Sequence, residues 1–151
     1  MAYEQLKLEN QLCFPVYAAS RLITREYQPH LDGLKITYPQ YLVLMVLWEH
    51  GFMTVKEISA KLILKTNTLT PLLKRMMNQG ILTRRRSDED ERNVIVELTK
   101  KGVQMQHEAA AIPEKLVKGL LSERLEVEDI IDLRNKLNTI IDYLSQKEKV
   151  L

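Results

Sequence analysis

Cysteine is almost absent from this sequence. A single Cys13 excludes an intramolecular disulfide framework and any zinc site built from several cysteines. Five glycines and five prolines among 151 residues exclude a collagen-like or linker-like chain. No run of about 18 apolar residues exists, and residues 1–11 lack the apolar stretch of a signal peptide. We therefore expect a cytoplasmic protein without membrane contact, whose lone thiol stays reduced until something oxidises it.

Histidine is scarce as well. His30, His50 and His107 lie in separate segments, and none of them shares metal-ligand spacing with another ligand-type residue. The sequence therefore predicts no metal site and no cofactor.

Net charge is only +2, but its distribution is uneven. Residues 56–86 contain eight basic side chains and one acidic side chain, a net charge of +7, which leaves −5 for the rest of the chain. A basic middle between acidic ends favours a polyanion-binding segment on a neutral or acidic scaffold. The alternative is a solvated, lysine-rich helical face.

The hydrophobic pattern predicts a mainly α-helical chain with one small β-hairpin. Apolar residues recur every three or four positions over 8–27, where Pro15 starts or kinks the helix, and residues 29–33 should end it. Further helices are predicted over 41–49, 55–61, 67–79 and 122–146, and over 99–121, where Pro113 breaks or bends the helix. Capping boxes beginning at Thr37 and Thr54 and a proline, Pro71, in a first turn mark helix starts. Residues 81–86 and 92–98 should form the hairpin, with a charged loop between them.

Two short helices followed by a hairpin are typical of a winged helix-turn-helix, which we assign to residues 37–98. The start of the second helix should present polar side chains to base edges, namely Thr66, Asn67, Thr68 and Thr70. Lys74 and Arg75 should meet phosphates. The hairpin should place Arg84, Arg85, Arg86 and Arg92 beside the DNA backbone or in the minor groove. The acidic residues 88–91 of its loop should hold neighbouring arginines in place. The alternative is a small α/β packing unit without DNA binding.

The terminal helices argue for a homodimer. Ile130, Leu133, Leu137, Ile140 and Leu144 form an apolar stripe longer than one small core needs, and the stripe over 8–27 likewise lacks a partner. We expect residues 1–36 and 99–151 to form a helical dimerisation region, which places two recognition helices on a pseudo-palindromic operator. The alternative is a helical bundle within one chain.

Cys13 is the remaining candidate for chemistry. A lone cysteine on an amphipathic helix is usually an inert small hydrophobe, and reactivity requires a stabilised thiolate. Tyr17 shares its helix face, whereas Tyr27 lies about 21 Å further along a straight helix. Tyr27 could reach Cys13 only if the first helices of two subunits run antiparallel, and Tyr38 could line the same site.

Several segments together resemble the MarR family and, within it, the organic-hydroperoxide-sensing OhrR branch. They are residues 12–21 (Leu-Cys-Phe-Pro-Val-Tyr-Ala-Ala-Ser-Arg), 34–41, 68–76 and 90–92 (Asp-Glu-Arg). The resemblance runs from about residue 6 to 112 and continues more loosely to the end. The wing motif marks the family in general, while Leu-Cys-Phe with the three tyrosines is more specific to the oxidant sensors.

The resemblance implies a dimeric winged-helix repressor of a peroxide-detoxification gene. Its reactive cysteine falls on Cys13, the tyrosines that contact it on Tyr17 and, from the other subunit, Tyr27, with Tyr38 nearby. The minor-groove arginine falls on Arg92 and its supporting acid on Asp90. A single-cysteine member needs organic hydroperoxide as oxidant and a low-molecular-weight thiol to trap the oxidised sulfur, so it is a switch and not an enzyme.

Three alternatives remain open at this point, beside a helical interaction module without DNA binding, which the +7 segment disfavours. The first is a MarR-type repressor released by an aromatic small molecule, with Cys13 incidental. The second is a broader thiol-based redox regulator on the same scaffold. The third is a thiol peroxidase, for which the sequence offers no resolving group.

Overall fold

The computed structural model describes residues 3–148, which form two compact units, residues 3–112 and 113–148. The chain is mainly helical with one small antiparallel sheet, as the sequence predicted. In residues 3–148, no helix combines the length and hydropathy that a membrane span requires. The extreme ends of the predicted dimerisation region, 1–2 and 149–151, lie outside the described residues.

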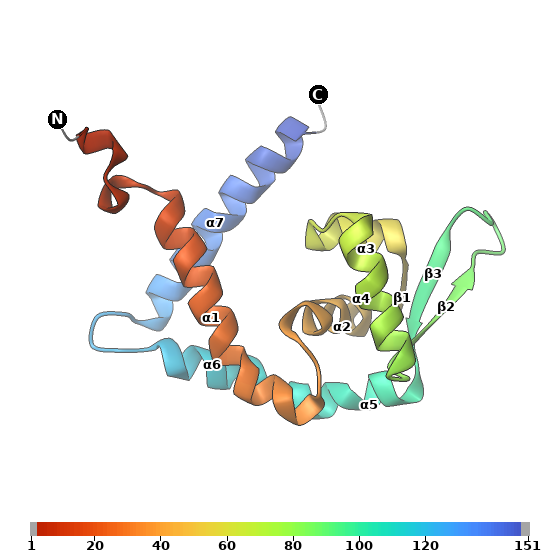
Figure 1. Ribbon diagram of the computed structural model, residues 1–151. Helices are drawn as coiled ribbons and strands as arrows, with labels where there is room; N and C mark the ends of the chain where they lie inside the picture. The colour runs from red at the N-terminus through yellow and green to blue at the C-terminus, as the bar shows by residue number, and fades with distance from the viewer. Residues whose placement is uncertain (1–2, 149–151) are drawn as a thin grey trace. The chain divides into compact units, whose positions relative to one another are not determined.

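The first unit begins with two single turns of 3₁₀ helix, Glu4–Leu6 and Leu8–Asn10, followed by α1 (Cys13–Leu34). The helix therefore starts at Cys13, and Pro15 falls in its first turn, where a missing N–H is tolerated. None of residues 3–30 is buried, and the N-terminal half of α1 extends away from the helices of the core (Figure 1).

The expectation that residues 29–33 end this helix is wrong. α1 runs through Pro29 and stops at Lys35, which adopts the left-handed conformation with φ 55°. The proline removes one backbone hydrogen bond, but Leu31 is fully buried and Leu34 packs against the same core, so tertiary packing continues the helix past it.

The two predicted capping boxes are confirmed. α2 (Tyr38–His50) follows Thr37, and α3 (Val55–Leu62) follows Thr54. In each box, the threonine side chain accepts a hydrogen bond from the backbone N–H three residues on, and the side chain of that residue accepts one from the threonine N–H. Gly51 closes α2 at φ +79°, which an L side chain rarely adopts.

α4 (Thr66–Asn78) completes the helix-turn-helix. Pro71 is its sixth residue, so the expectation of a first-turn proline is wrong. The ring is exposed, and the helix is maintained because Leu69, Leu72, Leu73 and Met76 bury its opposite face.

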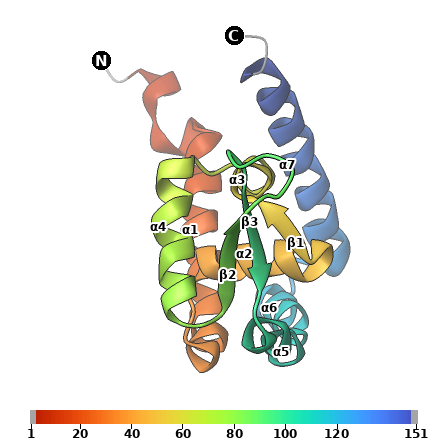
Figure 2. The ribbon, with the colours of Figure 1, turned by 90° about the vertical axis from the view of Figure 1, so that its right-hand side faces the viewer.

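The sheet has three strands, one more than predicted. β2 (Leu82–Arg86) and β3 (Val94–Leu98) form the hairpin, and β1 (Phe52–Thr54) pairs with the other side of β3, which lies in the middle (Figure 2). β1 joins α2 to α3, so the wing and the helix-turn-helix share one sheet.

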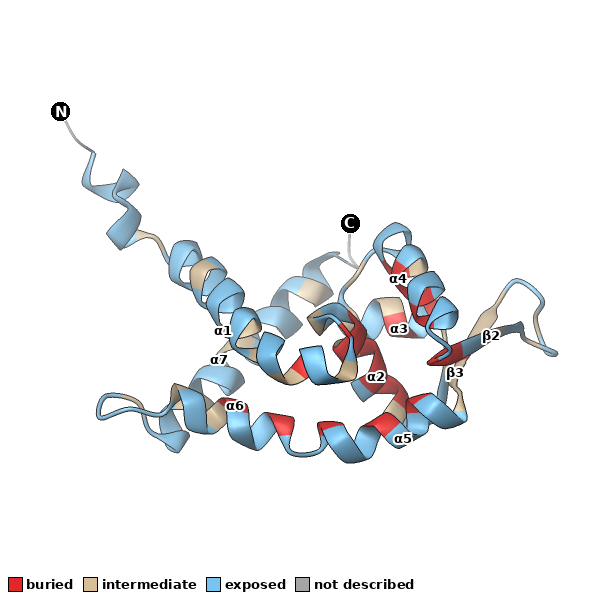
Figure 3. Cartoon of the chain, turned by 60° about the horizontal axis from the view of Figure 1, so that its bottom comes forward, coloured by how far each residue is buried: buried red, intermediate tan, exposed pale blue. Residues whose placement is uncertain are grey.

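The core of the first unit extends beyond residues 37–98. Buried residues are concentrated on α2, α3, α4 and the helix after the hairpin, α5 (Lys100–Ala109) (Figure 3). The cluster also includes Leu31 and Ile36 before residues 37–98 and Met105 and Ala109 after them. α5 packs closely, because the space of a Cβ at Gly102 is filled by the backbone carbonyl of Ile81.

The predicted helix over 99–121 is two helices, α5 and α6 (Ile112–Leu120). The break precedes Pro113, which becomes the second residue of α6, a position that suits proline. In the second unit, α7 (Val127–Glu148) starts five residues later than the predicted 122, because Ser122 and Leu125 pair in a short turn. α7 has no buried residue within its described length.

Candidate DNA interface and thiol site

The first turn of α4 lies at the surface of the helix-turn-helix. Thr66, Asn67 and Thr68 are exposed, and Thr70 is half-buried. Lys74 and Arg75 are exposed one to two turns further on. The buried positions of α4 are interleaved at helical spacing, so one face packs and the other carries every predicted DNA-contacting residue of this helix.

The hairpin arginines differ in how they are held. Arg85 Nε donates to Glu97 Oε1 across the hairpin at 3.1 Å, and its guanidinium lies 3.7 Å from Asp88. Arg86 is exposed and Arg84 is half-buried. The expectation that loop acids hold neighbouring arginines is confirmed for Asp88, while the strand partner Glu97 was not foreseen.

Arg92 is fixed by Asp90 within the loop of the wing. Its Nε donates to Oδ1 at 3.0 Å, a second guanidinium nitrogen donates to Oδ2 at 3.3 Å, and the Arg92 backbone N–H also donates to Oδ1. The side chain of Arg92 is nevertheless 88% exposed. Asp90 therefore orients an accessible guanidinium without covering it.

These hydrogen bonds hold the pKa of Asp90 below its usual value, the side chain of Arg92 contributing most and its backbone N–H next. A lowered carboxyl pKa means that the pair is present at neutral pH and is lost only as the pH falls through that lowered value.

Cys13 is exposed at the first residue of α1. Tyr17 lies one turn later and is also exposed, with the guanidinium of Arg21 over its ring at 5.4 Å from the centroid. The N-terminal end of α1 thus carries the exposed Cys13 thiol and, on Tyr17, a phenol ring with the Arg21 cation beside it.

Tyr27 and Tyr38 belong to a second group, the tyrosine cluster, which we define as Tyr27, Tyr38 and Tyr41. Ring centroids are 4.8 Å apart for Tyr27 and Tyr38 and 5.8 Å apart for Tyr27 and Tyr41. Trp48 extends the cluster, with its ring centroid 6.2 Å from that of Tyr41. Burial, followed by the neighbouring phenols Tyr38 and Tyr41, raises the pKa of Tyr27 to about 12.

One chain does not bring the thiol to this cluster. Cys13 and Tyr27 lie on one continuous helix, fourteen residues and about 21 Å apart along its axis. The structure thus groups Cys13 with Tyr17, and Tyr27 with Tyr38. Sequence reasoning missed Tyr41, although its place three residues after Tyr38, on the same face of one helix, was the available signal.

Residues 25–109 match the transcriptional regulator SarA/Rot family. The organic hydroperoxide resistance transcriptional regulator of Bacillus subtilis (strain 168) is 48% identical over 145 residues, which cover 96% of this chain and 97% of the relative. The chain belongs to the MarR family, in the branch of the organic hydroperoxide resistance regulators.

Other MarR relatives agree over the full length. The regulator MgrA of Staphylococcus aureus is 34% identical, covering 95% of this chain and 99% of that protein. AbfR of Staphylococcus epidermidis, solved in its reduced form bound to DNA, is 38% identical with a TM-score of 0.75 and covers 95% of this chain and 99% of that chain. AbfR has also been solved with a disulfide formed, with 38% identity and a TM-score of 0.63 over 95% of each chain.

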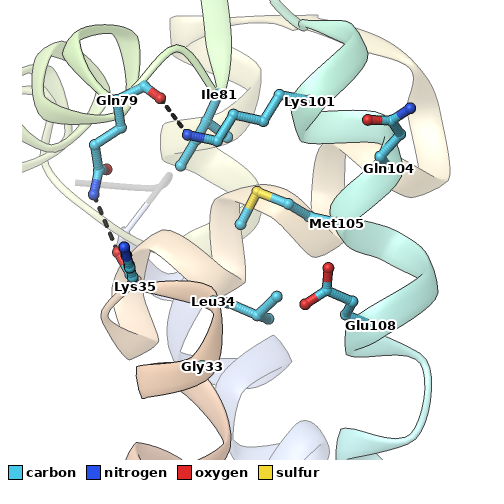
Figure 4. Close-up of a pocket in the computed structure, with 9 residues that line it drawn as sticks. All are labelled: Gly33, Leu34, Lys35, Gln79, Ile81, Lys101, Gln104, Met105 and Glu108. Carbon is cyan, nitrogen blue, oxygen red and sulfur yellow. Dashed lines mark hydrogen bonds between the residues drawn. The ribbon is translucent and has the colours of Figure 1, made fainter.

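A pocket of about 420 Å³ in this MarR family chain contains none of the predicted site residues. It lies where the end of α1 and the end of α4 meet one face of α5 (Figure 4), and its lining includes Lys35, Gln79, Lys101, Met105 and Glu108.

Proposed function

We propose that this chain is a dimeric, DNA-binding transcriptional repressor that senses organic hydroperoxides through oxidation of Cys13. The observation that carries the proposal is the 48% identity to the Bacillus subtilis regulator over 96% of the chain, in a sequence whose one cysteine is exposed. The protein acts as a stoichiometric switch and works in the cytoplasm, where operator DNA is available.

DNA binding uses α4 and the wing. The exposed first turn of α4 enters the major groove, where Thr66, Asn67, Thr68 and Thr70 face base edges, and Lys74 and Arg75 meet phosphates. Arg92, oriented by Asp90, enters the minor groove, while Arg84, Arg85 and Arg86 lie along the sugar–phosphate backbone of the DNA. The +7 charge of residues 56–86 supports this arrangement, since phosphate neutralisation dominates affinity.

The redox step begins at the Cys13 thiolate. The sulfur attacks the distal oxygen of the hydroperoxide, the O–O bond breaks, and the leaving alkoxide takes a proton to become the alcohol. Sulfur is oxidised by two electrons to a sulfenic acid, and the peroxide is reduced by two. A low-molecular-weight thiol then displaces water to give a mixed disulfide.

Two subunits complete the sensor. Residues 1–36 and 99–151 form the dimerisation region in this proposal, supported by the exposed apolar side chains along α1 and α7. Antiparallel first helices would bring Tyr27 and Tyr38 of one subunit to Cys13 of the other. The neutral Tyr27 phenol can then donate a hydrogen bond to the thiolate, which favours its ionisation. An oxidised, bulkier sulfur loses this contact, the half-site spacing changes, and the operator is released.

Cys13→Ser tests the proposal. We expect this variant to bind its operator as the wild type does and to remain bound after treatment with tert-butyl hydroperoxide and free cysteine. Fluorescence anisotropy measures binding, and intact mass reports the mixed disulfide in the wild type. Release of the Cys13→Ser variant by hydroperoxide would contradict the thiol switch, and release by an aromatic ligand alone would favour the small-molecule alternative.

A further inference from the structure

A pair of glutamine side chains joins three helices of the first unit. Among residues 3–148, Gln40 is the buried polar side chain of the core, with only 4% of its surface exposed. Its Nε2 donates to Gln79 Oε1 at 3.1 Å, across 39 residues of sequence. Gln79 in turn donates its Nε2 to the backbone carbonyl of Lys35 at 3.1 Å (Figure 4).

The orientation of each amide is fixed by backbone groups. Gln40 Oε1 accepts the N–H of Thr37 at 2.9 Å in the capping box, so its Nε2 must point to Gln79. Gln79 must then use its oxygen toward Gln40 and its nitrogen toward the Lys35 carbonyl. Gln40 is buried and Gln79 is exposed, and the two amides satisfy these hydrogen bonds together in one arrangement only.

Gln79 also marks the end of α4. Its N–H donates to the Arg75 carbonyl at 3.0 Å, and its own carbonyl accepts from Lys101 Nζ of α5 at 2.8 Å (Figure 4). The last turn of α4 is thereby tied to the end of α1, the first turn of α2 and α5.

The other end of this connection lies in the tyrosine cluster. Gln40 stands between Tyr38 and Tyr41 in the first turn of α2, and Tyr27 of α1 packs on both rings. The rings of Tyr38 and Tyr41 are therefore carried by the same helical turn whose Gln40 contacts Gln79.

We propose that Gln40 and Gln79 are positioning residues that couple the tyrosine cluster to α4. The inference rests on the proposed function. Movement of the cluster after Cys13 oxidation shifts the first turn of α2, and the amide pair carries the shift to the C-terminal end of α4, changing how that helix meets DNA. Coupling of this kind is a free energy shared between two sites, so weakening the connection should weaken the response to oxidant.

Variants at the two glutamines separate the coupling from folding. Gln40→Glu keeps an acceptor for the Thr37 N–H but cannot donate to Gln79, so either Gln79 or the Lys35 carbonyl loses a partner. Gln79→Ala removes both links. The double variant Gln40→Glu with Gln79→Lys restores a donor both to the carboxylate introduced on α2 and to the Lys35 carbonyl. Gln104→Ala, which removes an exposed amide at the rim of the same pocket, is the matched control.

The measurement is the operator Kd of full-length protein before and after tert-butyl hydroperoxide with free cysteine. The probe is a labelled duplex selected from a random pool by the reduced wild type. In Gln40→Glu and Gln79→Ala, the oxidised-to-reduced ratio of Kd should fall by about two- to tenfold, the factor that one neutral hydrogen bond carries. The double variant and Gln104→Ala should keep the wild-type ratio.

Thermal denaturation of each variant identifies a merely structural role. Lower stability with an unchanged oxidised-to-reduced ratio of Kd would overturn the coupling. A double variant whose ratio is as low as that of Gln40→Glu would overturn it as well. If Gln79→Ala does not fold, Gln40→Glu and its rescue decide alone. A wild type that ignores the oxidant would overturn the proposed function and this coupling together, whereas equal responses in the wild type and the single variants would overturn only the coupling.

Discussion

Tyr27 stays uncharged at neutral pH, which suits the role of hydrogen-bond donor to the thiolate that we propose for it. Burial and two neighbouring phenols raise its pKa to about 12, so at neutral pH it keeps its proton and has an O–H available as a hydrogen-bond donor. A hydrogen-bond donor stabilises a thiolate more than a thiol, which lowers the pKa of the cysteine that receives it.

The raised pKa of Tyr27 predicts a pH dependence. Its phenol titrates near pH 12 in the folded protein and near 10 when unfolded, so the stability it contributes is present below pH 10 and is lost as the pH rises toward 12. Absorbance at the phenolate band should show a component near pH 12 that Tyr27→Phe removes and that Tyr143→Phe, on exposed α7, retains. If the component near pH 12 persisted in Tyr27→Phe, its assignment to Tyr27 would be contradicted.

Arg92 should matter for DNA binding more than its exposure suggests. If it enters the minor groove, Arg92→Ala should cost about 1–3 kcal/mol of operator binding. Asp90→Asn should cost less, because it keeps the arginine's charge and removes only the ionic hydrogen bonds that orient it. Anisotropy across a salt series measures both.

Arg134→Ala is the matched control for Arg92, since Arg134 is an exposed arginine of α7 outside the basic segment. If Arg92→Ala bound the operator as tightly as the wild type, the role assigned to Arg92 in the minor groove would be wrong.

At the scale of elements, α3 depends on its cap. Thr54 ends β1 and caps α3, accepting from the Glu57 N–H at 3.2 Å while the Glu57 carboxylate accepts from the Thr54 N–H and hydroxyl. Thr54→Ala should lower the free energy of unfolding by about 1 kcal/mol. Urea unfolding at fixed protein concentration measures it.

Thr139→Ala, at an exposed helical position of α7, should cost little and controls for the loss of a hydroxyl. A cost for Thr54→Ala no larger than for Thr139→Ala would mean that α3 is held by packing alone.

Local signals in the sequence predicted the elements well, and long-range packing explains the misses. The capping boxes at Thr37 and Thr54 need only four consecutive residues, so they were visible. The three residues of β1 are too short for a pattern of their own and form a strand because β3 lies beside them. Pro29 read as a stop because the burial of Leu31, which extends α1 past it, depends on residues distant in sequence.

The contacts of the candidate site likewise fall into those that the local sequence predicts and those that only the tertiary fold creates. Exposure of the first turn of α4 follows from the spacing of its leucines, and the Asp90–Arg92 pair spans two residues, so both could be predicted. Glu97 approaches Arg85 only through strand pairing, and Gln79 reaches Gln40 only through the tertiary fold. No periodicity in the sequence points to either contact.

For the whole molecule, the exposed apolar side chains of α7 predict a dimer seam. Leu137→Asp with Ile140→Asp should place two charges in that seam and release monomers or unfold the chain. Light scattering decides the outcome. Asn138→Asp, beside the stripe, adds charge to the same helix and should leave the dimer intact. A folded, DNA-binding dimer with both aspartates would mean that this stripe does not join subunits.

The cross-subunit placement of Tyr27 has its own test. In Tyr27→Phe homodimers, alkylation of Cys13 near neutral pH should slow. Heterodimers of a Tyr27→Phe chain and a Cys13→Ser chain contain one reactive cysteine, whose tyrosine partner would be the intact Tyr27 of the other subunit. Such heterodimers should react at the wild-type rate. A rate as slow as that of the Tyr27→Phe homodimer would show that the tyrosine acts within its own chain.

The position of the only tryptophan gives this protein an internal optical probe. Trp48 Nε1 donates to the Gly102 carbonyl of α5 at 2.9 Å, and its ring is the neighbour of Tyr41. All indole emission therefore originates at the junction of α2 and α5, and light absorbed by the nearby tyrosines can be transferred to it. Rearrangement of those rings should alter the excitation spectrum, whereas separation of α2 from α5 should shift the emission to the red. The two events can thus be timed independently, without a label, in a single stopped-flow experiment.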